Sequence, residues 1–144
     1  MKHYYTDGSA SPNPGPGGFA VIDLDAKAPV ALGKEANSTN IRMEAMALIA
    51  AYKIAEPDDV IMTDSEFWVN VVTKWAPGWK ANGWTKKTGP IKNLELVQEL
   101  FALYESKPGV KLKWTRGHVG TEGNELADEW ANKAREGATL DVAH

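Results

Sequence analysis

Apolar and polar positions along the chain follow a strand-like pattern up to about residue 38 and a mixed pattern beyond it. Short apolar or alternating runs predict three strands, at His3–Thr6, Phe19–Leu24 and Val30–Glu35. The segment Ser11–Gly18 contains three prolines and three glycines and predicts only loop or turn. The chain is therefore expected to begin with an antiparallel meander.

Beyond this meander, predicted helices alternate with short apolar strands. The helices are expected at Ile41–Glu56, Glu66–Trp75, Pro90–Ser106 and Asn124–Glu136. A cluster of helix-capping residues precedes the first of them, and Pro77 is expected to end the second. Strands are expected at Val60–Thr63 and Val110–Thr115. This order favours an α/β fold, in which a mixed sheet carries helices on both faces and the later strands run parallel to the first.

Composition and charge are those of one globular domain over residues 1–144, with 43% hydrophobic and 24% charged residues. The absence of cysteine excludes disulfides, thiolate metal sites and a cysteine nucleophile, and it fits a reducing compartment. The sequence lacks a transmembrane-length apolar run and a signal-peptide core, so a cytoplasmic protein is expected. The net charge of −3, taken alone, argues against a nucleic-acid partner.

Two aspartates follow apolar strands in similar contexts, Asp7 in Thr-Asp-Gly-Ser and Asp64 in Thr-Asp-Ser. The carboxyl ends of parallel strands meet at one edge of a sheet, so the two are expected to lie close together. Each could instead cap the turn or helix that follows it. Glu44 and Asp128 lie near predicted helix starts, where the helix dipole alone could account for them. Four other aspartates are interpreted as solvated: Asp23, Asp25, Asp58 and Asp59.

Four converging carboxylates without cysteine would suit Mg²⁺ or Mn²⁺ rather than zinc. Two such ions can straddle a phosphodiester, one activating water and the other stabilising the leaving oxygen. Spacing alone does not single out these four among the 19 acidic residues of the chain.

Read together and in order, several strings resemble type 1 ribonuclease H. They are Tyr5-Thr6-Asp7-Gly8-Ser9, Asn13-Pro14-Gly15-Pro16-Gly17-Gly18, Thr39-Asn40-Ile41-Arg42-Met43-Glu44, Thr63-Asp64-Ser65, Gly117-His118 and Gly123-Asn124-Glu125-Leu126-Ala127-Asp128. The resemblance covers essentially the whole chain and implies the ribonuclease H-like fold, with a five-stranded mixed sheet of order 3-2-1-4-5. It also implies metal-dependent endonucleolytic cleavage of the RNA strand of RNA/DNA hybrids, which leaves 5′-phosphate and 3′-hydroxyl ends.

The resemblance further implies the catalytic residues. The four metal-binding acids of the family map onto Asp7, Glu44, Asp64 and Asp128, which would hold two Mg²⁺ ions with substrate, Mn²⁺ being an alternative. The histidine of the family's mobile loop maps onto His118, where it would aid proton transfer or product release. Flanking glycines and a pKa near neutrality suit an imidazole to that role.

Substrate-binding residues are implied in the same way. Asn13 and Asn40 match positions near the RNA minor groove, where 2′-hydroxyls distinguish RNA from DNA; a turn asparagine and a helix cap are their simpler interpretations. Thr39 and Asn93 match a pocket for a phosphate of the DNA strand. Glu66 departs from the family, because relatives often carry a neutral polar residue such as glutamine there, and the change would alter hydrogen bonding to RNA or nearby pKa values.

The segment from Phe67 to Leu94 combines four tryptophans and five lysines with no acid. It matches the basic protrusion of the family, in which Trp75, with Phe67 and Trp79, would line the DNA channel; Trp68 is expected in the core. Aromatic rings interleaved with lysines suit contact with a nucleic-acid backbone. The rest of the chain then carries −8, that is −3 minus 5, so the total charge conceals a basic segment.

Two other functions remain open at this stage. One is a catalytically silent module that binds RNA/DNA hybrids, and the other is a DNA junction nuclease on the same fold. The presence of all four acids and the histidine disfavours the first, and Asn13, Asn40 and the basic segment disfavour the second. A free-standing monomer is expected, with an RNA/DNA hybrid as substrate, no obligate protein partner and no membrane.

Overall fold

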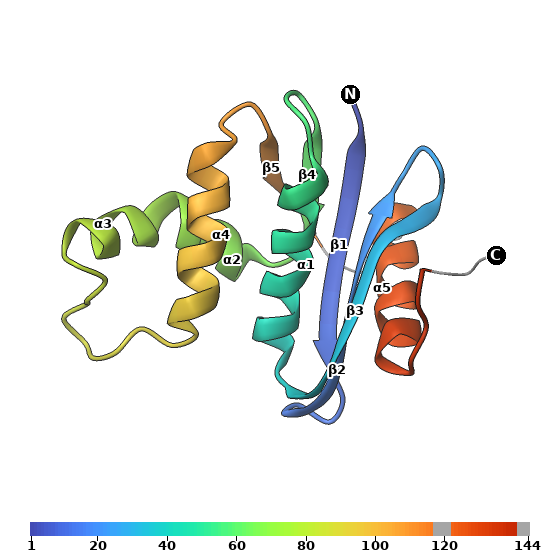
Figure 1. Cartoon of the computed structure of the whole chain (residues 1–144), viewed down its shortest axis with the longest axis horizontal. Helices are drawn as coiled ribbons and strands as arrows, with labels where there is room; N and C mark the ends of the chain where they lie inside the picture. Colours follow the sequence, from blue (N-terminus) through green and yellow to red (C-terminus); the bar gives the residue numbers. More distant parts are fainter. Residues whose placement is uncertain (117–121, 141–144) are drawn as a thin grey trace.

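The computed structural model describes residues 1–116 and 122–140, and the strands in this part form one five-stranded sheet of order β3-β2-β1-β4-β5 (Figure 1). The strands are β1 His3–Ala10, β2 Gly15–Asp23, β3 Ala28–Ser38, β4 Val60–Thr63 and β5 Lys111–Trp114. Strands β1, β2 and β3 pair antiparallel, whereas β4 pairs parallel with both β1 and β5. The predicted mixed sheet and its strand order are confirmed.

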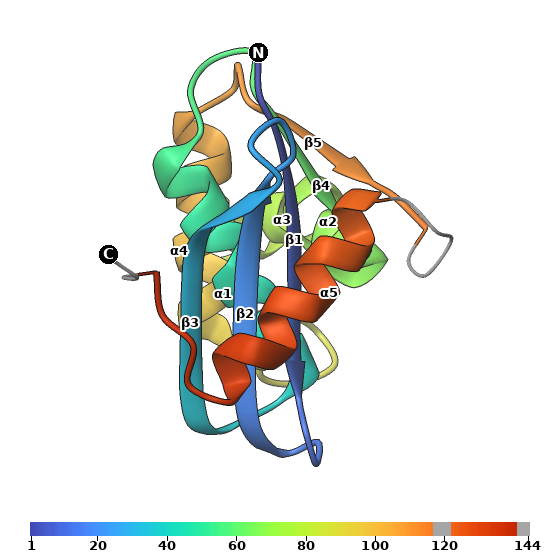
Figure 2. The ribbon, with the colours of Figure 1, turned by 90° about the vertical axis from the view of Figure 1, so that its right-hand side faces the viewer.

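Helices cover both faces of this sheet, as predicted. They are α1 Asn40–Ile54, α2 Glu66–Asn70, a π-helical turn Val71–Trp75, α3 Ala76–Ala81, α4 Leu94–Ser106 and α5 Glu122–Arg135. Helix α5 lies on one face, and α1 and α4 lie on the other (Figure 2). Among the described residues, no helix combines the length and apolar character that crossing a bilayer requires.

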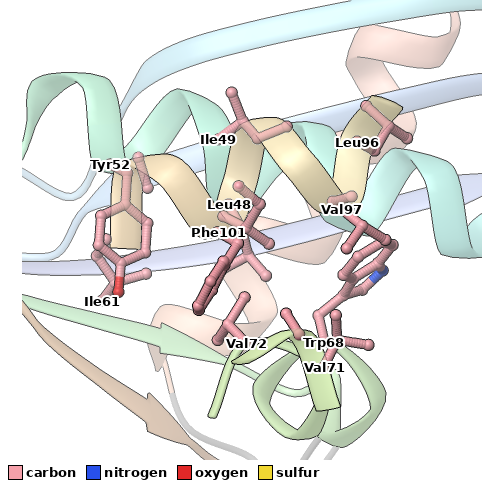
Figure 3. Packing of buried hydrophobic residues seen from close by; sticks show 14 of the residues in the cluster. Leu48, Ile49, Tyr52, Ile61, Trp68, Val71, Val72, Leu96, Val97 and Phe101 are labelled. Carbon is pink, nitrogen blue, oxygen red and sulfur yellow. The ribbon is translucent and has the colours of Figure 1, made fainter. Parts of the chain in front are cut away.

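The larger core fills the space between the sheet, α1, α4 and the α2 region (Figure 3). Trp68 is only 1% exposed there, as the sequence predicted, and Tyr52 and Leu48 of α1 are fully buried with it. A smaller cluster under α5 consists mainly of small side chains: Ala20, Ile22, Ala127 and Ala131. Helix α5 therefore packs close to β1 and β2.

One glycine on each face of the sheet allows a helix to pack closely on it. A Cβ atom at Gly8 of β1 would overlap the backbone of Met43 in α1, and one at Gly18 of β2 would overlap the backbone of Arg135 in α5. The prediction that residues 11–18 form only loop was therefore wrong at its end, since β2 already begins at Gly15. Gly8 and Gly18 serve helix packing rather than a turn.

Two helix boundaries also differ from the prediction. Helical structure continues past Pro77, because this proline is in the first turn of α3, directly after the π-helical turn, where a missing N–H costs nothing. Helix α4 begins at Leu94 rather than at Pro90, after Asn93, which has a left-handed φ of 56°.

The interpretation of Asp23 and Asp59 as solvated was wrong: they are 4% and 5% exposed. The Asp59 carboxylate accepts hydrogen bonds from the N–H groups of Lys2 and Glu56, both at 2.8 Å. Asp23 accepts N–H bonds within its own turn and pairs with the Lys2 ammonium at 3.2 Å. Both carboxylates thus satisfy backbone donors at the edge opposite the candidate site.

Candidate active site

Strand register brings Asp7 and Asp64 to the same edge of the sheet. The predicted end of the first strand at Thr6 was wrong, since β1 continues to Ala10 and Asp7 lies within it, whereas Asp64 directly follows β4 as predicted. Thr6 of β1 is the partner of Thr63 of β4 in the parallel ladder. Asp7 and Asp64 are the residues that directly follow this pair. Burial and then the charge of Asp64 are the largest causes of the raised pKa of Asp7. The prediction that the two aspartates lie close together is supported.

Helices on the two faces supply the other two acids. Alternate residues of β1 face opposite sides, and Tyr5 and Ser9 both contact α5, through Gly123 and Arg135 respectively. Asp7 shares their face, on which Asp128 of α5 lies. Glu44 comes from the second turn of α1, on the other face, and is half-buried.

The electrostatics of these acids indicates a site for positive charge. Burial, followed by the charges of Asp64 and Asp128, raises the pKa of Asp7 to about 8, although the N–H of Gly8 donates to its Oδ1 at 2.8 Å. Burial and the charge of Asp64 raise the pKa of Glu44 to about 7, and a hydrogen bond from Ser65 opposes this shift. Both shifts arise because carboxylates are held together with limited solvent.

These residues fit a hard cation in donor chemistry but do not enclose one by themselves. Their donors are all oxygen atoms, which Mg²⁺ and Mn²⁺ prefer. Within residues 1–116 and 122–140, no three His, Cys, Asp or Glu side chains are arranged so that they could already hold a metal ion. This agrees with Mg²⁺, which commonly takes one or two carboxylates and completes its shell with water and substrate phosphates.

The two asparagines predicted to face RNA are joined in the structure. The Asn40 N–H donates to Asn13 Oδ1 at 3.1 Å, and Asn40 Oδ1 accepts from the N–H of Ala10 at 2.7 Å. The backbone thus engages the carbonyl oxygens of both side chains, which leaves their NH₂ groups as donors. The simpler interpretation of Asn40 as the helix cap was wrong, because Thr39 is the N-cap of α1.

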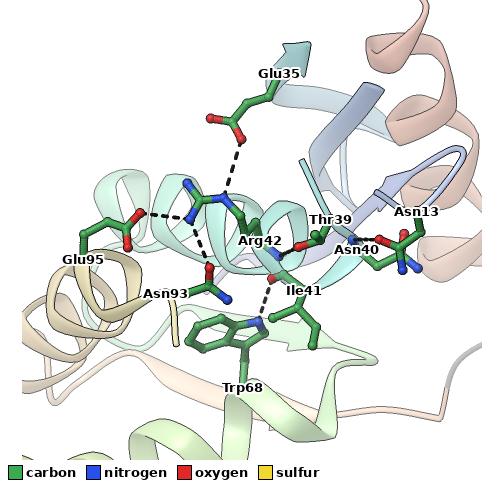
Figure 4. A network of polar contacts seen from close by, with 9 residues as sticks. All are labelled: Asn13, Glu35, Thr39, Asn40, Ile41, Arg42, Trp68, Asn93 and Glu95. Carbon is green, nitrogen blue, oxygen red and sulfur yellow. Dashed lines mark hydrogen bonds and ion pairs between the residues drawn. The ribbon is translucent and has the colours of Figure 1, made fainter. Parts of the chain in front are cut away.

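Thr39 and Asn93, the residues predicted to hold a phosphate, belong to a second network (Figure 4). The Thr39 hydroxyl accepts from the backbone N–H of Arg42 at 3.1 Å. The Arg42 guanidinium in turn donates to Asn93 Oδ1 at 3.1 Å. One arginine therefore connects the start of α1 to the start of α4.

Three aromatic residues of the segment 67–94 line a pocket of about 600 Å³: Phe67, Trp75 and Trp79. Ring centroids lie 5.9 Å apart for Phe67 and Trp75 and 6.2 Å apart for Trp75 and Trp79. Three lysines contribute to the same lining: Lys86, Lys87 and Lys92. The structure thus brings together the three aromatic residues predicted to line a channel.

Two other residues were predicted to belong to the site, Glu66 and His118. Glu66 is exposed in the first turn of α2, two residues beyond Asp64. His118 lies outside the residues that the structure describes, so its predicted role stays a prediction.

Sequence reasoning missed three residues around these acids. Ser65 caps α2 and hydrogen-bonds Glu44, and the Trp114 indole N–H donates to the backbone carbonyl of Asp64 at 3.3 Å. Arg42 lies in the motif Thr39–Glu44, but no function was predicted for it. For Ser65, its position directly after Asp64 was a usable signal. The Trp114 bond to Asp64 and the Arg42 side-chain bond to Asn93 each join residues at least 50 positions apart.

Comparison with known proteins agrees with this fold. The family model described as RNase H matches residues 2–136. A Ribonuclease H of Agrobacterium fabrum is 44% identical over 142 residues, covering 94% of this chain and 97% of that protein. A Ribonuclease H of Methylorubrum extorquens is 43% identical over 134 residues, covering 91% of this chain and 58% of its own length.

Among solved structures, the crystal structure of LC9-RNase H1, a type 1 RNase H with the type 2 active-site motif, has a TM-score of 0.77. It is 30% identical to this chain, and the match covers 96% of this chain and 73% of that one. The fold and site thus define a ribonuclease H-like nuclease domain. The chain belongs to the RNase H family, which confirms the resemblance and the prediction of a ribonuclease H enzyme.

Proposed function

We propose that this protein is a metal-dependent endonuclease that hydrolyses the RNA strand of RNA/DNA hybrids. The carboxylate cluster supports this most directly: burial, together with the charges of neighbouring carboxylates, raises the pKa values of Asp7 and Glu44. A divalent cation relieves that repulsion. Relatives that share 43–44% identity over most of this chain are Ribonuclease H.

In the proposed mechanism, Asp7, Glu44, Asp64 and Asp128 hold two Mg²⁺ ions when substrate is present, and Mn²⁺ can replace them. When bound, the ions supply water activation and charge stabilisation at the phosphodiester. Asp7 and Asp64 fix the position of the site, since both follow directly on paired strand residues. His118 assists proton transfer or product release, and the products carry 5′-phosphate and 3′-hydroxyl ends.

Substrate selection is assigned to two surfaces. The NH₂ groups of Asn13 and Asn40 remain available as donors and suit acceptors in the minor groove of the hybrid, among them 2′-hydroxyl oxygens. The DNA strand contacts Trp75, Trp79 and the neighbouring lysines, where aromatic rings and positive charge lie together without an acid. Glu66 is exposed two residues after Asp64, and in this proposal it alters hydrogen bonding to the RNA strand beside Asp64. We propose that the enzyme acts as a monomer.

The test uses three duplexes of one sequence: all DNA, DNA with a short RNA tract in one strand, and RNA/DNA hybrid. With Mg²⁺, cleavage is expected in the RNA tract and in the hybrid but not in the all-DNA duplex, and Asp64→Asn is expected to abolish it. Binding of the hybrid without cleavage would instead identify a silent binding module. Cleavage of branched or all-DNA substrates would identify a DNA junction nuclease.

A further inference from the structure

Glu66 is an isolated acidic residue in a basic stretch of the chain. Between Asp64 and Glu95 the sequence contains one acidic residue, Glu66, and five lysines. Glu66 is exposed in the first turn of α2. Within residues 1–116 and 122–140, its carboxylate makes no ion pair or hydrogen bond. A carboxylate there repels the phosphates of a nucleic acid, so it lowers affinity unless the substrate donates a hydrogen bond to it.

The position of Glu66 lies between the surfaces assigned to the two strands of the substrate. Asp64, two residues earlier, belongs to the site at which the RNA strand is cleaved in the proposed function. Phe67, the next residue, lines the pocket assigned to the DNA strand. The space between the two strands of a duplex is a groove, and its floor consists of base-pair edges. Glu66 is therefore placed to meet base edges as well as backbone.

Contacts with α1 hold the start of α2 beside Asn40. Ser65, the N-cap of α2, hydrogen-bonds Glu44 of α1. The Trp68 indole N–H donates to the backbone carbonyl of Ile41 at 2.8 Å (Figure 4). Asn40 precedes Glu44 by four residues of α1, so the two side chains share one face of that helix. The first turn of α2 is thus held next to the surface that is proposed to contact the minor groove.

The hydrogen-bonding chemistry of Glu66 differs from that of the two asparagines on this surface. Asn13 and Asn40 present NH₂ donors, which suit the acceptor atoms of bases in the minor groove. An ionised carboxylate can only accept. Among base edges in the minor groove, the N2 amino group of guanine is the one donor. The 2′-hydroxyl can also donate, but every nucleotide of the RNA strand carries one, so it gives no preference among bases.

We propose that Glu66 makes cleavage selective for base sequence, because its carboxylate accepts a hydrogen bond from the 2-amino group of a guanine close to the cleaved phosphodiester. This inference rests on the proposed function and adds a sequence preference to it. Hybrids with a G·C pair at that position are cleaved faster than hybrids with an A·U or A·T pair, whose minor-groove acceptors face the carboxylate without a donor.

The test uses hybrids in which a short RNA tract within a DNA strand confines cleavage to a few bonds, with guanines around them. Each guanine, in either strand, is replaced in turn by inosine, which lacks only the 2-amino group. At one position the replacement is expected to lower kcat/KM of wild type roughly three- to tenfold, through loss of one charge-assisted hydrogen bond. At the same position, 2,6-diaminopurine, which adds the amino group to adenine, is expected to be cleaved faster than adenine.

Glu66→Gln tests whether Glu66 recognises this amino group. Glutamine both accepts and donates, so the variant is expected to cleave the guanine and inosine hybrids at rates within roughly twofold of each other. Inosine weakens base pairing equally for both proteins, so the comparison between them isolates the side chain. Glu56→Gln is the matched control. Glu56 is exposed beyond α1, next to Asp59 at the opposite edge of the sheet, and its substitution is expected to keep the wild-type preference.

Three outcomes would overturn the inference and leave the proposed function intact. The first is that inosine at no position slows wild type more than it slows Glu66→Gln. The second is an equal loss of preference in Glu56→Gln, which would indicate an effect of net charge only. The third is a difference between wild type and Glu66→Gln that disappears on removal of one 2′-hydroxyl but not with inosine. A wild-type protein that cleaves no hybrid would instead overturn the proposed function, and this inference with it.

Discussion

At the scale of single residues, the carboxylates of the site work against the stability of the fold. Asp7 lies on β1, where the negative charges of Asp64 and Asp128 repel its ionised carboxylate. Burial adds to this opposition, since the charged form of a carboxylate loses hydration. Asp7 is therefore placed where a cation can be bound, at a cost to the folded state whenever the cation is absent.

Asp7→Asn is expected to abolish cleavage and to stabilise the metal-free protein at pH 8. The pKa of Asp7 is about 8 in the folded protein against an ordinary 3.8, so the unfolded chain releases this proton more readily and wild-type stability falls as pH rises between these values. The variant should gain on the order of 2 kcal/mol at pH 8 and nothing near pH 3.5. Denaturant unfolding at both pH values measures this.

Asp58→Asn makes the same chemical change at an exposed turn residue and is expected to leave the pH dependence unaltered. Mg²⁺ should raise the unfolding midpoint of wild type at pH 8 and raise that of Asp7→Asn much less. Equal pH dependence in wild type and Asp7→Asn would contradict the proposed repulsion within the cluster.

Sequence reasoning succeeded for residues whose positions depend on local pattern. Asp7 and Asp64 were located because each directly follows a short apolar run in the sequence. It failed for Gly17 and Gly18, which resemble a turn in sequence but lie in β2, because the contacts that require glycine come from distant segments. Gly17 meets the side chain of Met43, and Gly18 meets α5 near Arg135.

At the scale of elements, the approach of α1 to β1 positions Glu44 relative to Asp7. Gly8 follows Asp7 directly and faces the backbone of Met43, the residue before Glu44. A side chain at Gly8 would therefore separate two elements that each carry one acid of the site. The segment 67–94 is held against α4 by an edge-to-face contact of Trp84 with Phe101 and by an ion pair of 2.8 Å between Lys80 and Glu105.

Gly8→Ala is expected to lower the free energy of unfolding by about 2–3 kcal/mol, because the added methyl group meets backbone that cannot rotate away. Activity should fall further than unfolding alone explains, since Glu44 moves with α1. Gly78→Ala is the control: a Cβ there meets nothing within 4 Å inside α3, and a gain of about 0.5 kcal/mol is expected. Similar stability of the two variants would contradict this account of the packing.

At the scale of the whole molecule, charge is separated rather than balanced. The segment 67–94 carries five lysines and no acid, whereas the remainder carries −8. A protein with a net charge of −3 can therefore present one positive surface to a polyanion. Long-range attraction to that surface is screened by salt over a Debye length of about 8 Å at physiological ionic strength.

Lys86→Gln with Lys87→Gln is expected to weaken hybrid binding and to reduce the salt slope by about one to two, since each phosphate contact contributes about 0.9. Lys27→Gln with Lys53→Gln changes the total charge equally at two exposed lysines away from the pocket and should leave the slope nearly unchanged. Titrations at several salt concentrations measure both slopes. Identical slopes would place the hybrid elsewhere.

The parallel pairing of β1 with β4 also limits how this site can change over evolution. Successive side chains of a strand alternate between faces at intervals of about 3.3 Å, and the position of Asp7 follows from the pairing of Thr6 with Thr63. Substitutions in β1 leave that spacing unaltered. A single inserted or deleted residue before Asp7 would turn its carboxylate from the α5 face to the α1 face. Lineages that keep the site should therefore vary in side chains within β1 and β4 but not in the number of residues.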